Sequence, residues 1–223
     1  MLSIVSTPIG NLGDITKRAI ETLSNVDAII CEDTRVTGNL CKQLEIPKKE
    51  FISMHSYTSD RKIEEVLKRL KKGEDMAVVT DAGTPGISDP GFKLISQARQ
   101  WKIEIEVIPG PSAFLAALSV SGLPANQFLY LGYLPLKKGR KRLLASFASE
   151  KHTIVFYESV HRIEKALNEL AEALGDQPER KVVIARELTK LHEEVIETTA
   201  AELPTVAQEI MKKGEFVVVV GAI

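Results

Sequence analysis

The stretch TDAGTPGISDPG, residues 80 to 91, carries three glycines, two prolines and two aspartates in twelve positions. It follows an apolar run at residues 76–79 and precedes a helical pattern at residues 92–101. A link between a strand and a helix usually needs only about two to six residues. Glycine lets a backbone approach a ligand closely, and proline fixes a loop before the ligand arrives. The stretch therefore predicts a rigid binding loop at the end of a strand in an α/β fold.

The first half of the chain alternates regularly between short apolar runs and amphipathic patterns. We expect strands at residues 2–6, 27–31, 76–80 and 103–108, and helices at residues 14–23, 34–44, 59–72 and 92–101. Apolar strands that alternate with helices indicate βαβ units, and hence a mostly parallel sheet.

The second half has a different rhythm. We expect strands at residues 128–133, 153–157, 182–186, 194–199 and 216–220, and helices at residues 160–174 and 203–213. The short connections near residues 194 and 216 favour antiparallel pairs in a mixed sheet. The stretch SVSGLPANQF (119–128) clusters Gly, Pro and Asn and is typical of a boundary. The sequence therefore predicts two α/β domains, residues 1–118 with a mostly parallel sheet and residues 119–223 with a mixed sheet.

Composition limits the classes of function. The 223 residues include 29 basic and 30 acidic side chains, so a nucleic-acid partner would need a local basic patch. Two cysteines ten residues apart and four scattered histidines predict neither a metal site nor a disulfide scaffold. The N-terminus lacks the pattern of a signal peptide, and no apolar run reaches the roughly 18 residues of a membrane span. We expect a soluble cytoplasmic protein without a membrane or metal partner.

Four segments of unusual sequence follow expected strands of the first half: STPIGNLGD (6–14), CEDTR (31–35), TDAGTPGISDPG (80–91) and IPGPSA (108–113). In open parallel sheets, ligands bind beyond the carboxyl ends of the strands. The chain contains neither GxGxxG nor GxxxxGK, and no Lys or Arg lies in residues 80–91. The loops offer backbone groups and hydroxyls (Thr7, Thr84, Ser88, Ser112). They suit a ligand with an adenine, a ribose and an amino-acid end better than a polyphosphate.

Six ordered motifs carry a family resemblance: STPIGNLGDIT, CEDTR, DAGTPGISDPG, IPGPSA, FYESVHRI and ARELTKLHEE. Together they resemble the tetrapyrrole methylase (class III) superfamily of S-adenosylmethionine-dependent methyltransferases. The likeness is strongest to members that 2′-O-methylate a cytidine ribose in the decoding region of small-subunit rRNA. The resemblance implies S-adenosyl-L-methionine as cofactor, the small ribosomal subunit as partner, and a homodimer.

The resemblance also implies the residues of the cofactor site, in a cleft between the two domains. The first domain would contribute Pro8, Ile9, Gly10, Asp81, Ala82, Gly83, Thr84, Pro85, Ile87, Ser112 and Ala113. Tyr157, Ala185 and Arg186, at strand ends of the second domain, would close the site.

Methyl transfer to a ribose hydroxyl needs an aligned oxygen and a group that takes its proton. Candidate catalytic residues are Glu32, Asp33 and Arg35 in the first domain, and Glu158, Glu187 and Lys190 in the second. Asp33 and Arg35 could instead cap or pair at a helix start, and Glu187 with Lys190 could form a local ion pair. The identity of the base stays open at this point.

Five of the six residues in KKGRKR (137–142) are basic: Lys137, Lys138, Arg140, Lys141 and Arg142. Phosphate charge dominates nucleic-acid affinity, so the run predicts an RNA-contacting arm, although a solvated loop is the alternative. Tyr130 and Tyr133 could stack on an unpaired base or simply pack in the sheet.

Two other functions compete with rRNA methylation. The same fold could methylate a tetrapyrrole carbon or a modified-histidine amine, but CEDTR, FYES and the basic run count against this. A non-catalytic nucleotide- or RNA-binding module is the third possibility, and the rigid loops at one sheet edge disfavour it.

Overall fold

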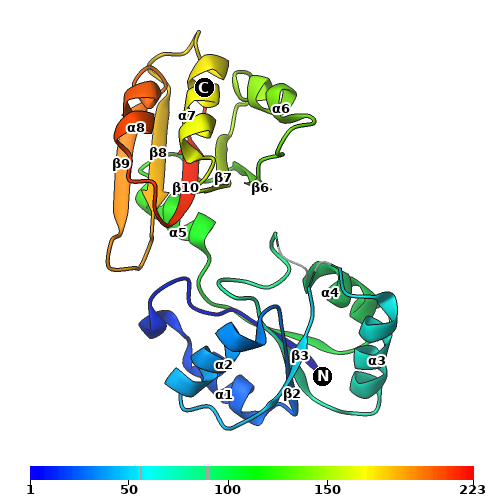
Figure 1. The fold of residues 1–223 in the computed structure, drawn as a ribbon. Coiled ribbons are helices and arrows are strands. Elements are labelled where there is room, and N and C mark those ends of the chain that lie inside the picture. Colours follow the sequence, from blue (N-terminus) through cyan, green and yellow to red (C-terminus); the bar gives the residue numbers. More distant parts are fainter. Residues whose placement is uncertain (56, 89–90) are drawn as a thin grey trace. The chain divides into compact units, whose positions relative to one another are not determined.

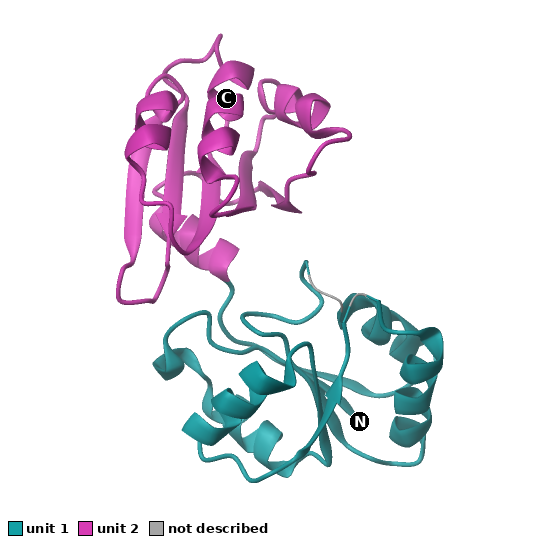
Figure 2. Cartoon of the chain, viewed as in Figure 1, with its two compact units in different colours: residues 1–112 teal, residues 113–223 magenta. Residues whose placement is uncertain are grey.

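The chain forms two compact units, Met1–Ser112 and Ala113–Ile223 (Figure 2). The computed structural model describes residues 1–55, 57–88 and 91–223. The sequence-based boundary lay between residues 118 and 119. Helix α5 (Ala113–Val120) groups with the second unit because it packs against strands of that unit's sheet.

The first unit is a five-stranded parallel sheet between two layers of helices (Figure 1). Its strands are ordered β3-β2-β4-β1-β5, and every pair is parallel. The strands are β1 (Leu2–Val5), β2 (Ala28–Cys31), β3 (Glu50–Ser53), β4 (Met76–Val78) and β5 (Ile105–Ile108). The helices are α1 (Lys17–Asn25), α2 (Thr34–Gln43), α3 (Asp60–Lys71), α4 (Gly91–Gln100) and the short 3-10 helix η1 (Leu12–Asp14).

Strand residues alternate between the two helix layers. In β2, Ala28 and Ile30 join the core that contains the apolar side chains of α3 and α4. Ile29 and Cys31 join the opposite core, which contains those of α1 and α2. Successive side chains of a strand point to opposite faces, so apolar residues at all four positions require a sheet that is covered on both sides.

The second unit holds a mixed sheet of order β6-β7-β10-β8-β9. Only β6 and β7 run parallel among its pairs, and the other three pairs are antiparallel. The strands are β6 (Phe128–Tyr133), β7 (Thr153–Ser159), β8 (Lys181–Arg186), β9 (Glu194–Thr199) and β10 (Glu215–Val220). The remaining helices are α6 (Arg140–Phe147), α7 (Ile163–Ala173) and α8 (Leu203–Glu209). The prediction of one parallel and one mixed α/β domain is confirmed.

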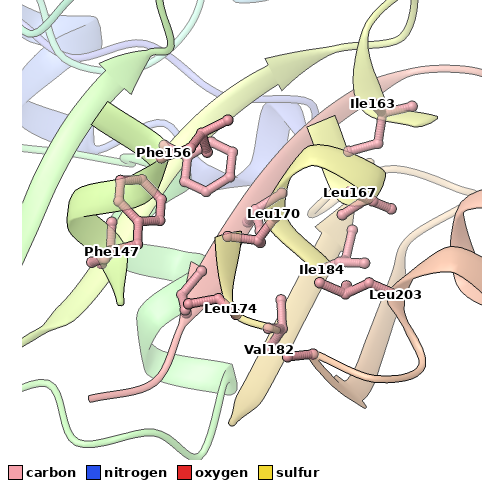
Figure 3. Packing of buried hydrophobic residues seen from close by; sticks show 14 of the residues in the cluster. Phe147, Phe156, Ile163, Leu167, Leu170, Leu174, Val182, Ile184 and Leu203 are labelled. Atoms are coloured by element: carbon pink, nitrogen blue, oxygen red, sulfur yellow. The ribbon is translucent and has the colours of Figure 1, made fainter. Parts of the chain in front are cut away.

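Helix α7 lies at the centre of the hydrophobic core of the second unit (Figure 3). Its apolar residues Ile163, Leu167 and Leu170 are fully buried against Val182 and Ile184 of β8. Their three- and four-residue spacing places them on one helix face, as the sequence pattern indicated.

Strand β3 and helix α6 differ from the sequence expectation. Strand β3 was not expected, because the four residues of EFIS are too few and too polar to give a clear alternation. Residues 140–147 form helix α6, whereas the basic run there was expected to be a loop or arm. No helix in the described ranges is long and apolar enough to cross a membrane.

Candidate cofactor and substrate site

The four motif loops of the first unit meet at one edge of its sheet. Strands β1, β2, β4 and β5 run parallel, so their carboxyl ends lie on the same side. The loops that leave these ends are the segments that begin at Ser6, Glu32, Val79 and Pro109. This is the edge at which open α/β sheets bind ligands.

Hydrogen bonds join the loops after β1 and β4. The Thr7 amide donates to the Gly83 carbonyl at 2.9 Å, and the Gly83 amide donates back to the Thr7 carbonyl at 3.1 Å. The Thr7 hydroxyl also donates to the Thr80 carbonyl at 3.1 Å. These hydrogen bonds therefore hold the two loops together.

The loop after β5 is bonded to these two loops through the hydroxyls of Ser6 and Thr84. The Thr84 hydroxyl donates to the Pro111 carbonyl at 3.2 Å and lies 3.0 Å from the Ser6 hydroxyl. A Cβ on Gly110 would lie 2.9 Å from the Cβ of Ser6, so only glycine lets these two backbones approach so closely. The three loops are consequently ordered by their own contacts.

Gly83 adopts a backbone conformation that L residues rarely take. Its φ is +87°, and among the described residues a Cβ there would meet Ile9 Cγ2 at 3.6 Å and the Pro111 carbonyl oxygen at 3.9 Å. Those are ordinary contacts, so the backbone angle, and not lack of space, makes this position favour glycine.

The expected cofactor residues between Pro8 and Ala113 fall into two groups. Ile9, Gly83 and Pro85 are buried and build the loop framework. The others present exposed or half-exposed surface: Pro8, Gly10, Asp81, Ala82, Thr84, Ile87, Ser112 and Ala113. Asp89 and Pro90, at the end of the 80–91 stretch, lie outside the described residues.

The motif CEDTR adds carboxylates to this edge. The Thr80 hydroxyl donates to Glu32 Oε1 at 2.6 Å, which ties the end of β2 to the end of β4. The Asp33 amide donates to Asp81 Oδ1 at 3.3 Å, which makes a second link between the same two loops. Glu32 is half-buried, and Asp81 is exposed.

Asp33 and Arg35 form the helix cap and ion pair that the sequence left as an alternative. Asp33 is the N-cap of α2 and accepts the Arg35 amide at 2.8 Å. It also accepts the Arg35 side-chain Nε at 3.0 Å. These hydrogen bonds lower the pKa of Asp33 to about 2. So weak a base accepts a proton poorly near neutral pH, which counts against Asp33 as the general base.

Glu158 is enclosed by two arginines. Its side chain is fully buried, with Arg140 Nη1 3.3 Å from Oε2 and Arg162 Nη2 2.7 Å from Oε1. The Ser159 amide donates to Oε1 at 2.8 Å. Both carboxylate oxygens are therefore used within the fold, and we interpret Glu158 as a structural residue in place of a base.

Glu187 and Lys190 form a local ion pair, extended by Glu215. Lys190 Nζ lies 2.8 Å from Glu187 Oε1 and 2.7 Å from Glu215 Oε2. The hydrogen bond from Lys190 lowers the pKa of Glu187. Partial burial opposes the charge of Lys190, but its bonds to the two carboxylates outweigh this and raise its pKa. Neither group is tuned towards proton abstraction at neutral pH.

The other expected residues of the second unit lie within the last three residues of β7 and β8. The ring of Tyr157 contacts Tyr130 and Tyr133, with centroids 5.7 and 5.4 Å apart, and burial raises its pKa. Ala185 is buried, as is Arg186, whose Nε lies 2.9 Å from Glu194 Oε2.

The basic run divides into two parts. Lys137, Lys138, Lys141 and Arg142 are exposed. Arg140 differs from the expectation of a phosphate contact, because it is only 5% exposed and its Nε lies 2.6 Å from Glu169 Oε2. One inward-turned residue in the run was not visible in the sequence, since the acidic partners lie 18 and 29 residues away.

Sequence reasoning also missed residues that hold the site together. It did not identify Ser6, Thr80 or Pro111 as the partners that join the loops. Their position one to three residues after a strand was the available signal. Within the described ranges, no cluster of three or more His, Cys, Asp or Glu side chains is arranged to hold a metal ion.

The fold has solved counterparts. A cobalt precorrin-4 methyltransferase, described as a cobalamin biosynthetic enzyme, superposes with a TM-score of 0.70 at 20% identity, over 99% of this chain and 94% of that one. A uroporphyrin-III C-methyl transferase from Thermus thermophilus, solved with S-adenyl homocysteine, gives a TM-score of 0.67 at 17% identity, over 99% and 96%. At these identities the likeness concerns the fold.

Sequence relatives are nearer. The chain is 44% identical over 218 residues to ribosomal RNA small subunit methyltransferase I of Thermotoga maritima, covering 98% of this chain and 96% of that protein. Proteins of the same name from Xylella fastidiosa and Escherichia coli O157:H7 are 46% and 44% identical. Each of these two matches covers 98% of this chain, and 80% and 77% of the relative. The sequence model of the tetrapyrrole (corrin/porphyrin) methylases matches residues 1–204. The chain therefore belongs to the tetrapyrrole methylase family, and within it to the group of ribosomal RNA small subunit methyltransferase I.

Proposed function

We propose that this protein uses S-adenosyl-L-methionine to 2′-O-methylate a cytidine ribose in the decoding region of small-subunit rRNA. The observation that carries the proposal is the 44–46% identity, over nearly the whole chain, to proteins named ribosomal RNA small subunit methyltransferase I. The nucleotide and the 2′-oxygen are the finer part of the proposal and rest on the motif resemblance. We expect a protein that modifies ribosomal subunits to work in the cytoplasm.

The joined loops of the first unit fit such a cofactor. They combine an exposed carboxylate at Asp81 with apolar surface at Ile87, which is 44% exposed, and with glycine backbone at Gly10. A carboxylate can accept hydrogen bonds from ribose hydroxyls or an ammonium group, and it would repel a polyphosphate. Tyr157, Ala185 and Arg186 of the second unit stay predictions for the same site.

Bound S-adenosylmethionine supplies a methyl group that its sulfonium already activates. The protein's remaining tasks are to hold the ribose oxygen in line with that methyl group and to take the hydroxyl proton. We propose that Glu32 is the general base that takes this proton. Of the five candidate proton acceptors, Glu32 lies at the end of β2 beside the joined loops, whereas Asp33 caps α2, and Glu158, Glu187 and Lys190 are held in ion pairs. Its hydrogen bond from Thr80 would orient the carboxylate.

We further propose that Lys137, Lys138, Lys141 and Arg142 contact RNA phosphates. All four are exposed, and they lie within six consecutive positions of a chain whose net charge is only −1. Such local charge supports nucleic-acid binding, whereas the bulk charge does not.

The test is methyl transfer from labelled S-adenosylmethionine to small ribosomal subunits that lack the modification, followed by nucleoside mapping. We expect label in one 2′-O-methylcytidine of the rRNA. Label in a base, or transfer to a tetrapyrrole and not to subunits, would contradict the proposal. Calorimetry without detectable binding of S-adenosylmethionine or S-adenosylhomocysteine would favour a non-catalytic RNA-binding protein.

A further inference from the structure

The four exposed cations of the basic run lie at the N-terminus of α6, where positive charge does not stabilise a helix. Lys141 and Arg142 lie in the first turn of α6, and Lys137 and Lys138 lie just before it. The N-terminus of a helix carries partial positive charge, so cations there are unfavourable. The N-cap, Gly139, has φ +83° and no side-chain cap bond. None of the four cations has an ion-pair partner among the residues that the structure describes. Their placement thus calls for an explanation outside the stability of the helix.

Arg140 does the opposite of its neighbours. Its guanidinium turns inward and bridges Glu169 on α7 and Glu158 at the end of β7. Glu158 is in turn held by Arg162, which is 22% exposed. The result is a partly buried network of two arginines and two glutamates, which we call the anchor (Arg140, Glu158, Arg162, Glu169).

The anchor also forms hydrogen bonds with the backbone of the segment that leads into the basic run. Arg140 Nη1 donates to the Pro135 carbonyl at 3.2 Å, and Arg162 Nη1 donates to the Leu134 carbonyl at 3.1 Å. These two carbonyls directly follow Tyr133, the last residue of β6, whose side chain is exposed. The anchor therefore fixes both ends of residues 134–140, which carry Lys137 and Lys138.

We propose that the anchor residues are positioning residues for RNA: they hold Lys137, Lys138, Lys141 and Arg142 as one preordered phosphate-binding surface. This inference rests on the proposed action on rRNA and deepens it. Fixing in advance the backbone that carries these cations removes part of the entropic cost of binding. A buried ion pair adds little net stability over apolar residues packed in its place, because the charges must be desolvated. The network is therefore better explained by the geometry that it imposes.

The discriminating substitution is Glu158→Gln. It removes a negative charge, so simple electrostatics predicts tighter RNA binding and an unchanged or steeper salt dependence. Loss of the anchor predicts the reverse: a higher KM for ribosomal subunits and a flatter salt dependence. Each lost phosphate contact should lower the slope by roughly 0.7–0.9 and weaken binding roughly fivefold at about 0.15 M salt. Both kcat at saturating subunits and cofactor affinity should stay at the wild-type value.

Arg162→Gln is the second variant, because it breaks the same anchor from a partly exposed position and is less disruptive to folding than a change at Glu158. The control is Arg69→Gln in the first unit, where Arg69 also bridges two glutamates, Glu50 and Glu74. It should lower the melting temperature without changing KM or the salt slope. The quadruple variant Lys137→Gln, Lys138→Gln, Lys141→Gln, Arg142→Gln should raise KM most, and adding Glu158→Gln to it should have little further effect.

Folded Glu158→Gln or Arg162→Gln proteins with wild-type KM and salt slope would overturn the anchor's role while leaving rRNA methylation intact. A quadruple variant with wild-type values would remove the RNA surface itself, and with it the inference. Absence of transfer to subunits by the wild-type protein would instead contradict the proposed function.

Discussion

Gly83→Ala separates the two contributions of the loop after β4, stability and cofactor binding. The φ of +87° at Gly83 is unfavourable for alanine, at a cost of about 1–2 kcal/mol. Contacts add little, because the nearest atoms to the new Cβ would be 3.6 and 3.9 Å away. For a chain of this length, that loss lowers the melting temperature by about 2 to 8 °C. The backbone can escape the strain only by shifting, and a shift breaks the reciprocal hydrogen bonds between Thr7 and Gly83.

Gly73→Ala is the matched control. Gly73 has φ +97° and open space around its Cβ position, and it follows α3, before β4 begins. The backbone strain is therefore similar, but no motif loop is involved. Both variants should lose stability to a similar extent in thermal unfolding. Only Gly83→Ala should weaken the affinity for S-adenosylhomocysteine in calorimetry, by about tenfold or 1.4 kcal/mol. Equal stability losses with unchanged affinity in both variants would show that this loop does not form the cofactor site.

Three further predictions concern the base, a helix cap and assembly. Glu32→Gln should lower kcat by roughly 10²- to 10⁴-fold with cofactor affinity kept, and unchanged kcat would exclude Glu32 as the base. The folded pKa of Asp33, about 2, lies below the unfolded value of about 3.9, so its contribution to stability is complete above about pH 5 and is lost as the pH falls from there towards 2. The stability difference between wild type and Asp33→Asn, measured by urea unfolding, should therefore shrink over that range; a constant difference would contradict the ion pair with Arg35. Sedimentation at micromolar concentration should give twice the chain mass of 24.6 kDa, since α5 exposes Leu115 and Val120; a monomeric mass would contradict the homodimer.

Much of the fold could be predicted because the apolar patterns are strong. Strand β9 was expected with its observed bounds, and most other expected strands agree to within about two residues. The weak elements were those whose sequence does not reveal their environment. Strand β3 lies at the sheet edge and is only four residues long. Helix α6 begins with charged residues that suggested solvent, yet Leu144 and Phe147 of the same helix are buried.

The position of the candidate site was predictable, but the state of its polar groups was not. Loops after parallel strands must share an edge, so STPIGNLGD, CEDTR and the 80–91 stretch could be assigned to one region from order alone. Whether a carboxylate is exposed or enclosed depends on partners distant in sequence. Glu158 and Glu32 look alike in the sequence, but Glu158 meets Arg140, which lies 18 residues earlier, together with Arg162, whereas Glu32 accepts the Thr80 hydroxyl.

The hydroxyls of the loops show how this changes the expected chemistry. The sequence suggested that Thr7 and Thr84 would offer hydroxyls to a ligand, but both donate to backbone carbonyls of neighbouring loops. A hydroxyl has one proton, so these two groups can only accept from a ligand while the loops stay joined. We therefore propose that donors to the cofactor come mainly from loop backbone groups, and that Asp81, which remains exposed although it accepts the Asp33 amide, is an acceptor for it. Rigid loops favour this arrangement, because backbone groups discriminate between ligands only when their positions are fixed before binding.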